Sequence, residues 1–203
     1  MNARRAARSP RWTRRDWIEH GIHQLKSEGP GAVTLERMCE TANRTRGSFY
    51  HHFATMGDFI AEVTSRWRRT DTDDIRALVL GEPSPREGLR LLSRLSDRID
   101  HRVELGVRAL ALTVPAVRAI VDRTDGDREA FLTDLLRRAY GLDARRAGDA
   151  ARLFHALHLA GLMRSPDRMR EFSLGPTRAL IGWLEQDAPA ASARARPLKR
   201  RRG

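Results

Sequence analysis

The sequence contains one cysteine and no long apolar run. Cys39 cannot form a disulfide bond within the chain, so an oxidising compartment is not implied. No apolar segment approaches the roughly 20 residues that span a bilayer. The arginine-rich N-terminus is not followed by the apolar core of a signal peptide. These absences predict a soluble, cytoplasmic protein.

The chain also lacks the sequence patterns of common catalytic and cofactor sites. It has no phosphate-binding glycine loop, no nucleophile elbow and no cysteine cluster for zinc. His155 and His158 have an i, i+3 spacing that could hold a ligand, and so do His101 and Glu104. Such pairs more often serve packing or surface contacts. We therefore expect no enzyme activity, no cofactor and no metal site.

Acidic residues are missing from both ends of the chain. The formal net charge is +12, yet residues 1–15 hold six arginines and no acid. Residues 188–203 hold five arginines and Lys199, again without an acid, which leaves 26 basic and 26 acidic residues between the two ends. The basic excess therefore lies in two tails, and we expect residues 1–11 and 188–203 to be disordered.

No strand pattern and no internal repeat is visible, and the 15 glycines and 9 prolines fall mostly at the ends of apparent helices. The sequence predicts an all-α fold. Pro115 should interrupt one helical segment, and Thr124–Asp127 should form a turn. The fourth helix either frays near residues 70–74 or continues to about Leu80. The expected helices cover approximately residues 13–28, 35–42, 46–52, 56–70, 85–99, 102–121, 128–140, 144–163 and 175–186.

The segment Thr34–Phe53 predicts two short helices joined by a tight turn. Apolar residues at Leu35, Met38, Cys39 and Ala42 recur with the i, i+3, i+4, i+7 spacing of one helix face. This inward position favours Cys39 as a small buried side chain over a redox sensor. Thr34 can cap the first helix, and Asn43 can end it in the left-handed conformation. A helix, a turn and a second helix form the unit that places its second helix in the major groove of DNA.

The second of these helices has a polar face suited to DNA. Phe49 and Phe53 anchor its apolar side, and no acid occurs between Thr41 and Gly57. Gly47 costs about 1 kcal/mol of helix stability relative to alanine, so its position requires a reason. It leaves room either for a phosphate to approach the backbone or for tight packing on the preceding helix. The residues expected to bind DNA are Thr34, Arg44, Thr45, Arg46, Gly47, Ser48, Tyr50, His51 and His52.

These motifs are similar to those of a known family. RGSFYHHF, preceded by TLERMCETANRT and followed by ATMGDFIAEV, strongly resembles the tetracycline-repressor-like (TetR) family of bacterial transcription regulators. The resemblance runs from about Thr13 to Trp67. The chain departs from the family at Asn43–Arg44, which replace Gly-Val, at Cys39, which replaces alanine, and at Met56–Gly57, which replace a common Lys-Glu pair. Met56 cannot supply the positive charge of that lysine.

The resemblance implies a division of the chain. Residues 12–70 would form the DNA-binding domain, with the helix-turn-helix at 34–53, and residues 71–187 an effector-binding and dimerisation domain. The basic arm would reach the DNA, or else remain a solvated tail. The last two helices would form a homodimer with their copies, or else bury both faces within one subunit. An effector site would be lined by apolar residues with a few polar groups, a composition that core residues share. The residues proposed for it are Leu92, His101, Leu110, Phe131, Leu135, His158 and Met163.

The resemblance therefore implies a repressor with three partners. It would bind double-stranded operator DNA of palindromic sequence, pair with its own copy, and be released by a small, moderately hydrophobic effector. It would have no membrane partner. Two alternatives remain open. The chain could be a constitutive DNA-binding protein without an effector, which the basic tails favour. It could also be a helical enzyme or partner-binding module whose head no longer binds DNA.

Overall fold

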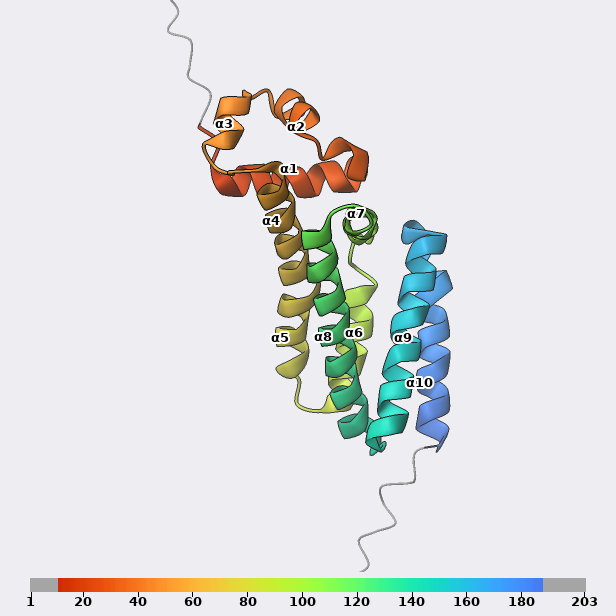
Figure 1. Ribbon diagram of the computed structural model, residues 1–203. Coiled ribbons are helices and arrows are strands. Elements are labelled where there is room, and N and C mark those ends of the chain that lie inside the picture. Colours follow the sequence, from red (N-terminus) through yellow and green to blue (C-terminus); the bar gives the residue numbers. More distant parts are fainter. Residues whose placement is uncertain (1–10, 188–203) are drawn as a thin grey trace, which may run out of the picture. The chain divides into compact units, whose positions relative to one another are not determined.

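The structure, a computed structural model, describes residues 11–187 (Figure 1). All regular secondary structure in this range is helical, as the sequence predicted. No described helix combines the length and apolar character that crossing a membrane requires. The predicted tails at 1–11 and 188–203 lie outside the described residues, except for Arg11.

The chain divides into two compact units. The first runs to Ile75 and also takes in Ile99–Gly126, and the second comprises Arg76–Arg98 and the residues from Asp127 onward. The first unit thus extends beyond the predicted boundary at residue 70.

The first unit begins with the helices of the predicted head. Thr13 starts the first helix through a reciprocal capping box with Asp16, and Gly29, with φ of 79°, ends the segment. In Figure 1, α2 and α3 lie together on one side of α1, and α4 leaves on the other side. The elements of this head are α1 (Arg14–Ser27), a 3-10 turn (Pro30–Ala32), α2 (Leu35–Ala42), α3 (Arg46–Tyr50) and α4 (Met56–Arg68).

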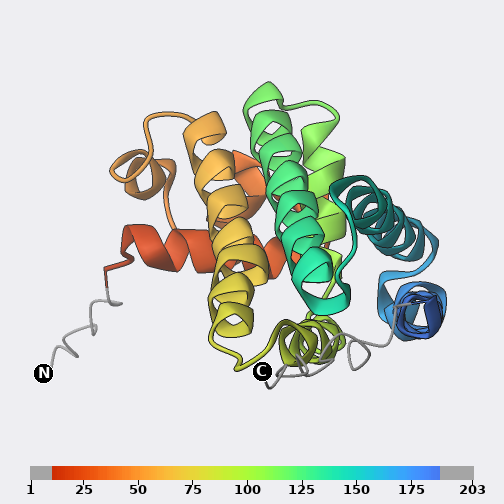
Figure 2. The same cartoon turned by 90° about the horizontal axis from the view of Figure 1, so that it is seen from below.

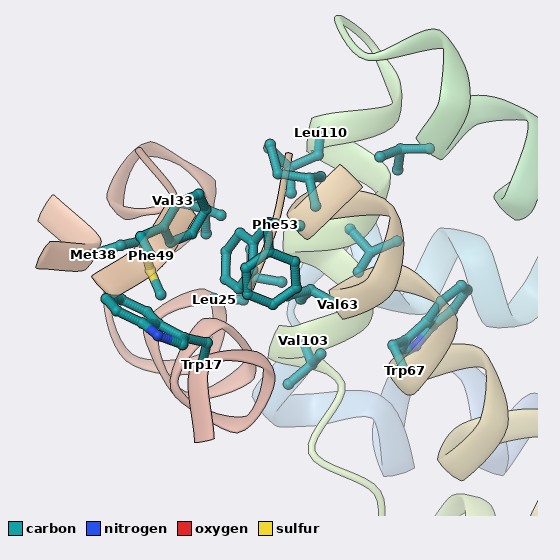
Figure 3. Packing of buried hydrophobic residues seen from close by; sticks show 14 of the residues in the cluster. Trp17, Leu25, Val33, Met38, Phe49, Phe53, Val63, Trp67, Val103 and Leu110 are labelled. Atoms are coloured by element: carbon teal, nitrogen blue, oxygen red, sulfur yellow. The ribbon is translucent and has the colours of Figure 1, made fainter. Parts of the chain in front are cut away.

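An aromatic core holds these helices together. Trp17 of α1 meets Phe49 of α3 edge to face, with ring centroids 5.3 Å apart, and Phe49 meets Phe59 of α4 at 5.2 Å. Figure 3 shows Trp17, Phe49 and Phe53 converging in this core. Gly21 lets α1 cross α4 closely (Figure 2), because a Cβ atom there would lie 2.7 Å from Cγ2 of Val63. The head is therefore packed tightly at the crossing of α1 and α4.

The fourth helix continues rather than frays. A π-helical stretch, Arg69–Asp73, links α4 to α5 (Asp74–Leu80). The Thr70 hydroxyl donates to the carbonyl oxygens of Arg66 and Trp67 at 3.1 Å each, which satisfies backbone groups where the helical register changes. Of the two expectations for this segment, continuation to Leu80 is confirmed.

Two further helices complete the first unit. They are α7 (Arg102–Ala111) and the first part of α8 (Pro115–Tyr140), so Pro115 divides the segment as expected. Arg108 joins them, since its guanidinium donates to Glu104 on its own helix and to Asp125 on α8, with the closest contacts at 2.7 Å. Desolvation opposes the charge of this part-buried group, but the two carboxylates prevail and raise the pKa of Arg108.

The predicted turn at Thr124–Asp127 is wrong, because α8 runs through it without a break. The Thr124 hydroxyl donates to the carbonyl oxygen of Ile120 at 2.7 Å, a bond within the helix, and caps no new one. A Cβ atom at Gly126 would meet only open space, so glycine costs the helix about 1 kcal/mol at most. The bonds from Arg108 to Asp125 fix the helix at this point.

The second unit contains α6 (Pro85–Ser96), the rest of α8, α9 (Ala144–Arg164) and α10 (Gly175–Asp187). Ser84 and Asp143 cap α6 and α9. A 3-10 turn (Pro166–Arg168) and a π-helical stretch (Arg170–Leu174) lead from α9 into α10. The α9 and α10 helices run side by side (Figures 1 and 2). At Gly161 of α9 a Cβ atom would lie 2.7 Å from the Cβ of Ser173, so glycine permits the π-helical stretch to pack closely on α9.

Candidate DNA-binding site

The helix-turn-helix forms through local hydrogen bonds that its sequence supplies. The hydroxyl of Thr34 accepts from the backbone amide of Arg37 at 3.3 Å, and that of Thr45 accepts from the amide of Ser48 at 3.2 Å. Asn43 ends α2 with φ of 50° and ψ of 53°, in the left-handed region. Both predicted caps and the predicted turn residue are confirmed. These bonds set the angle at which α3 leaves the turn.

The α3 helix buries its aromatic side and exposes its polar side. Phe49 is fully buried, whereas the Tyr50 side chain beside it is 51 % exposed. Thr45, Arg46 and His51 are exposed as well, and Ser48 is half-buried. The structure therefore brings most of the predicted DNA-binding residues onto one exposed surface. Thr34 is exposed at the start of α2.

Gly47 lies on the same exposed surface. A Cβ atom built there would have only one neighbour within 4 Å, the hydroxyl of Thr45 at 3.8 Å. Tight packing on the preceding helix, one of the two explanations for this glycine, is thereby excluded. Space for the close approach of another molecule remains as the explanation.

Arg46 pairs with an acidic residue of α2, which the sequence did not reveal. Its guanidinium donates to the carboxylate of Glu36 in the first turn of α2 at 2.7 Å. Both side chains are about two-thirds exposed, at 64 % and 65 %. On the same helix, Glu40 pairs with Arg37 at 3.2 Å, within α2. A carboxylate thus stands beside the principal arginine of the exposed surface.

Two predicted DNA-binding residues contact Trp12, which precedes α1. The half-buried guanidinium of Arg44 lies over the Trp12 ring, 5.4 Å from the centroid. The Nε2 of His52 lies 2.9 Å from the carbonyl oxygen of Trp12, so the ring donates to it. His51 is bonded to Arg11 at 3.0 Å. Arg44 and His52 therefore support the turn and the end of α3 from within the head.

Arg14 secures α3 from another side, a role that its position in the sequence does not indicate. Its guanidinium lies 4.5 Å from the centre of the Phe53 ring and donates to the carbonyl oxygen of His52. It also forms an ion pair with Glu62 of α4, and this hydrogen bond holds the pKa of Glu62 below its ordinary value. One arginine thus links α1, the end of α3 and α4.

The seven predicted effector residues are divided between the two units. His101 and Leu110 belong to the first unit and are buried. In the second unit Leu135 is buried, Leu92, Phe131 and His158 are half-buried, and Met163 is 73 % exposed. Met163 therefore does not face the interior of the chain.

A cavity of about 230 Å³ lies in the first unit, between α1, α4 and the start of α7. Its polar lining includes two ion pairs, Glu19–Arg66 at 2.8 Å and Lys26–Asp100 at 3.0 Å. None of the seven predicted effector residues lines it. This cavity therefore does not support the effector prediction.

The α9 and α10 helices each expose an apolar stripe. On α9 the exposed residues Leu153, Ala156, Ala160 and Met163 follow one face at i, i+3, i+7 and i+10. On α10 the exposed residues Pro176, Ala179 and Trp183 follow one face at i, i+3 and i+7. Trp183 is 64 % exposed and Leu153 49 %. Exposed apolar stripes of this kind are typical of surfaces that another molecule covers.

The first unit has the architecture of a helix-turn-helix DNA-binding head. Neither a protein-family model nor a curated protein matches the sequence. Solved structures do match the fold. A candidate transcriptional regulator from Pseudomonas aeruginosa PAO1 has a TM-score of 0.70 at 20% identity, over 86% of this chain and 91% of that chain.

Two further solved structures also match the fold of this chain. A candidate transcriptional regulator from Saccharomonospora viridis, in complex with choline, has a TM-score of 0.68 at 16% identity, over 86% of this chain and 96% of that chain. A candidate regulator of the TetR/AcrR family has a TM-score of 0.65 at 18% identity, over 85% and 94%. The chain therefore has the fold of the TetR/AcrR transcriptional regulators, as its motifs predicted.

Proposed function

We propose that this chain is a DNA-binding transcriptional regulator that contacts its operator through α3. The observation that carries this proposal is the arrangement of that helix, with Phe49 buried and the side chains of Arg46 and Tyr50 exposed. Arginine can read guanine through two hydrogen bonds, and tyrosine can donate to phosphates or bases. Thr45 and Ser48 would fix the register on the duplex.

The regulator would act as a homodimer. The exposed apolar stripes of α9 and α10 support an interface between two copies, and they disfavour the alternative in which both helices bury all their apolar faces within one subunit. A two-fold dimer places two recognition helices in successive major grooves, about 34–36 Å apart. Its operator would therefore be palindromic.

We assign the chain as a repressor that a small, moderately hydrophobic molecule releases from DNA. Such an effector works only if it binds the DNA-free arrangement more tightly than the DNA-bound one. The Saccharomonospora viridis structure, which holds choline, is a precedent within the same fold. The basic residues of 188–203 instead favour a constitutive DNA-binding protein. Compounds that dissociate the protein–DNA complex at fixed salt would support an effector-released repressor. A compound library without effect would support a constitutive DNA-binding protein.

The proposal is tested by binding to DNA that flanks the gene of this protein. Fluorescence anisotropy at low salt should show specific binding by the wild type. The double variant Arg46→Ala/Tyr50→Ala should lose it while keeping the oligomeric state of the wild type. Arg118→Ala is a matched control, because this arginine is exposed on α8, outside the helix-turn-helix. Normal operator binding by the double variant would overturn the assignment of α3. Absence of any specific binding by the wild type would favour a partner-binding module.

A further inference from the structure

The pair formed by Arg46 and Glu36 is a feature that the proposed function does not explain. It lies on the exposed surface that we assign to DNA, and its carboxylate would approach the phosphates of a duplex. An acidic side chain is electrostatically unfavourable at such a position, because neutralisation of phosphates dominates affinity for DNA. The structure instead joins Glu36 to Arg46 at 2.7 Å across the turn between α2 and α3.

The pairing leaves most of the guanidinium available. Arginine carries five N–H donors in a planar fork, and Glu36 accepts from the terminal nitrogen Nη2. No other hydrogen bond to Arg46 is formed within residues 11–187. Two adjacent donors can therefore still meet the O6 and N7 acceptors of a guanine while the carboxylate holds the fork in place.

The carboxylate also changes which acceptor the arginine prefers. A free guanidinium carries a full positive charge and is drawn to the nearest phosphate. A guanidinium paired with a carboxylate forms a group of zero net charge, so it gains little from a phosphate, and the carboxylate itself is repelled there. The attraction of the guanidinium to the neutral acceptors of a base edge depends mainly on hydrogen-bond geometry, so the pairing retains it.

We propose that Glu36 is a positioning residue that determines specificity by directing Arg46 to a base edge instead of a phosphate. This inference rests on the proposed DNA-binding function. Glu36 lowers total affinity for DNA and raises discrimination at one base pair. Glu40 differs in its role, because it pairs with Arg37 on the same helix and does not reach α3.

The test compares Glu36→Gln with Glu40→Gln, which removes the same charge from the same helix. A duplex selected from a random pool by the wild type, and its single-base variants, serve as probes. The base pair read by Arg46 is the one at which Arg46→Lys loses discrimination. At that base pair Glu36→Gln should reduce discrimination about tenfold. The slope of log K against log salt should steepen by about 0.9, which corresponds to one additional phosphate contact.

Glu40→Gln should leave discrimination unchanged. This control measures the change in affinity that results from removing any acidic charge near the DNA. Glu36→Ala, which also removes the hydrogen-bond acceptor, should reduce discrimination at least as much as Glu36→Gln. If Glu36→Gln keeps both the discrimination and the slope of the wild type, the role of Glu36 is refuted while the proposed function stands. A uniform loss of affinity for all duplexes would make Glu36 only a structural support and would refute it as well. If the wild type selects no sequence from the pool, the proposed function itself fails, and this inference with it.

Discussion

Replacing Gly47 with alanine should separate the stability of the head from its ability to bind DNA. Gly47 is exposed on α3, and an added Cβ atom would meet only the Thr45 hydroxyl, at the ordinary distance of 3.8 Å. The folded head therefore accommodates alanine without strain. Among residues 11–187 no packing contact requires glycine there, so any loss of DNA binding that alanine causes should arise in the complex with DNA.

The two effects of this substitution have opposite signs. Alanine is favoured over glycine in a helix by about 1 kcal/mol, and less near a helix end, so the free energy of unfolding should rise by about 0.5 kcal/mol. Binding should weaken, because a methyl group would separate the backbone of α3 from the DNA. The loss of one close backbone contact corresponds to about 1 kcal/mol, or roughly a fivefold increase in Kd.

Urea unfolding followed by tryptophan fluorescence measures the first effect, since the buried Trp17 and Trp67 both belong to the first unit. Anisotropy with the operator duplex measures the second. Gly126→Ala is the matched control, because this glycine is also exposed, lies in a helix and has no neighbouring atoms within 4 Å of an added Cβ. It should stabilise the protein without changing DNA binding. A Gly47→Ala variant that binds the operator as tightly as the wild type would refute the close-approach explanation.

Three other substitutions test the packing, the electrostatics and the assembly of the chain. Gly21→Ala should lower the unfolding free energy by about 1–3 kcal/mol in urea, because its Cβ would lie 2.7 Å from Val63; unchanged stability would contradict this packing. Hydrogen bonds from Arg102 lower the pKa of Asp100 to about 2, so its carboxylate stabilises the fold above pH 3.8 and loses this effect as the pH falls through 2. Asp100→Asn should therefore cost about 1 kcal/mol at pH 7 and nothing below pH 2; a pH-independent difference in chemical denaturation would exclude this linkage. Trp183→Glu should convert a dimer to monomers in sedimentation velocity, and an unchanged dimer would place the interface elsewhere.

The predictions from sequence succeeded where the determining interaction is local. Thr34 and Thr45 cap their helices through amides three residues ahead, and Asn43 adopts the left-handed conformation by itself. The same local reasoning failed at Thr124–Asp127. There the polar residues are typical of a turn, but the bonds between Arg108 and Asp125, 17 residues apart, hold the segment in a continuous helix. A pattern within four residues contains no information about that arginine.

In the candidate site, too, local sequence determines the helix caps, whereas contacts with distant residues determine how α3 is held. The α3 helix has only five residues, too few for a helix that is stable by itself, so its geometry depends on contacts from the rest of the head. Arg14, Trp12 and the buried Phe49 provide them, and each comes from a distant position or from the opposite face. The polar side chain of His52 predicts a contact with DNA, and in the structure it contributes a bond that holds the end of α3 in place. Part of the polar surface of this short helix is thus required to maintain the helix, and under the proposed function a smaller part is left for reading bases than the sequence pattern predicts.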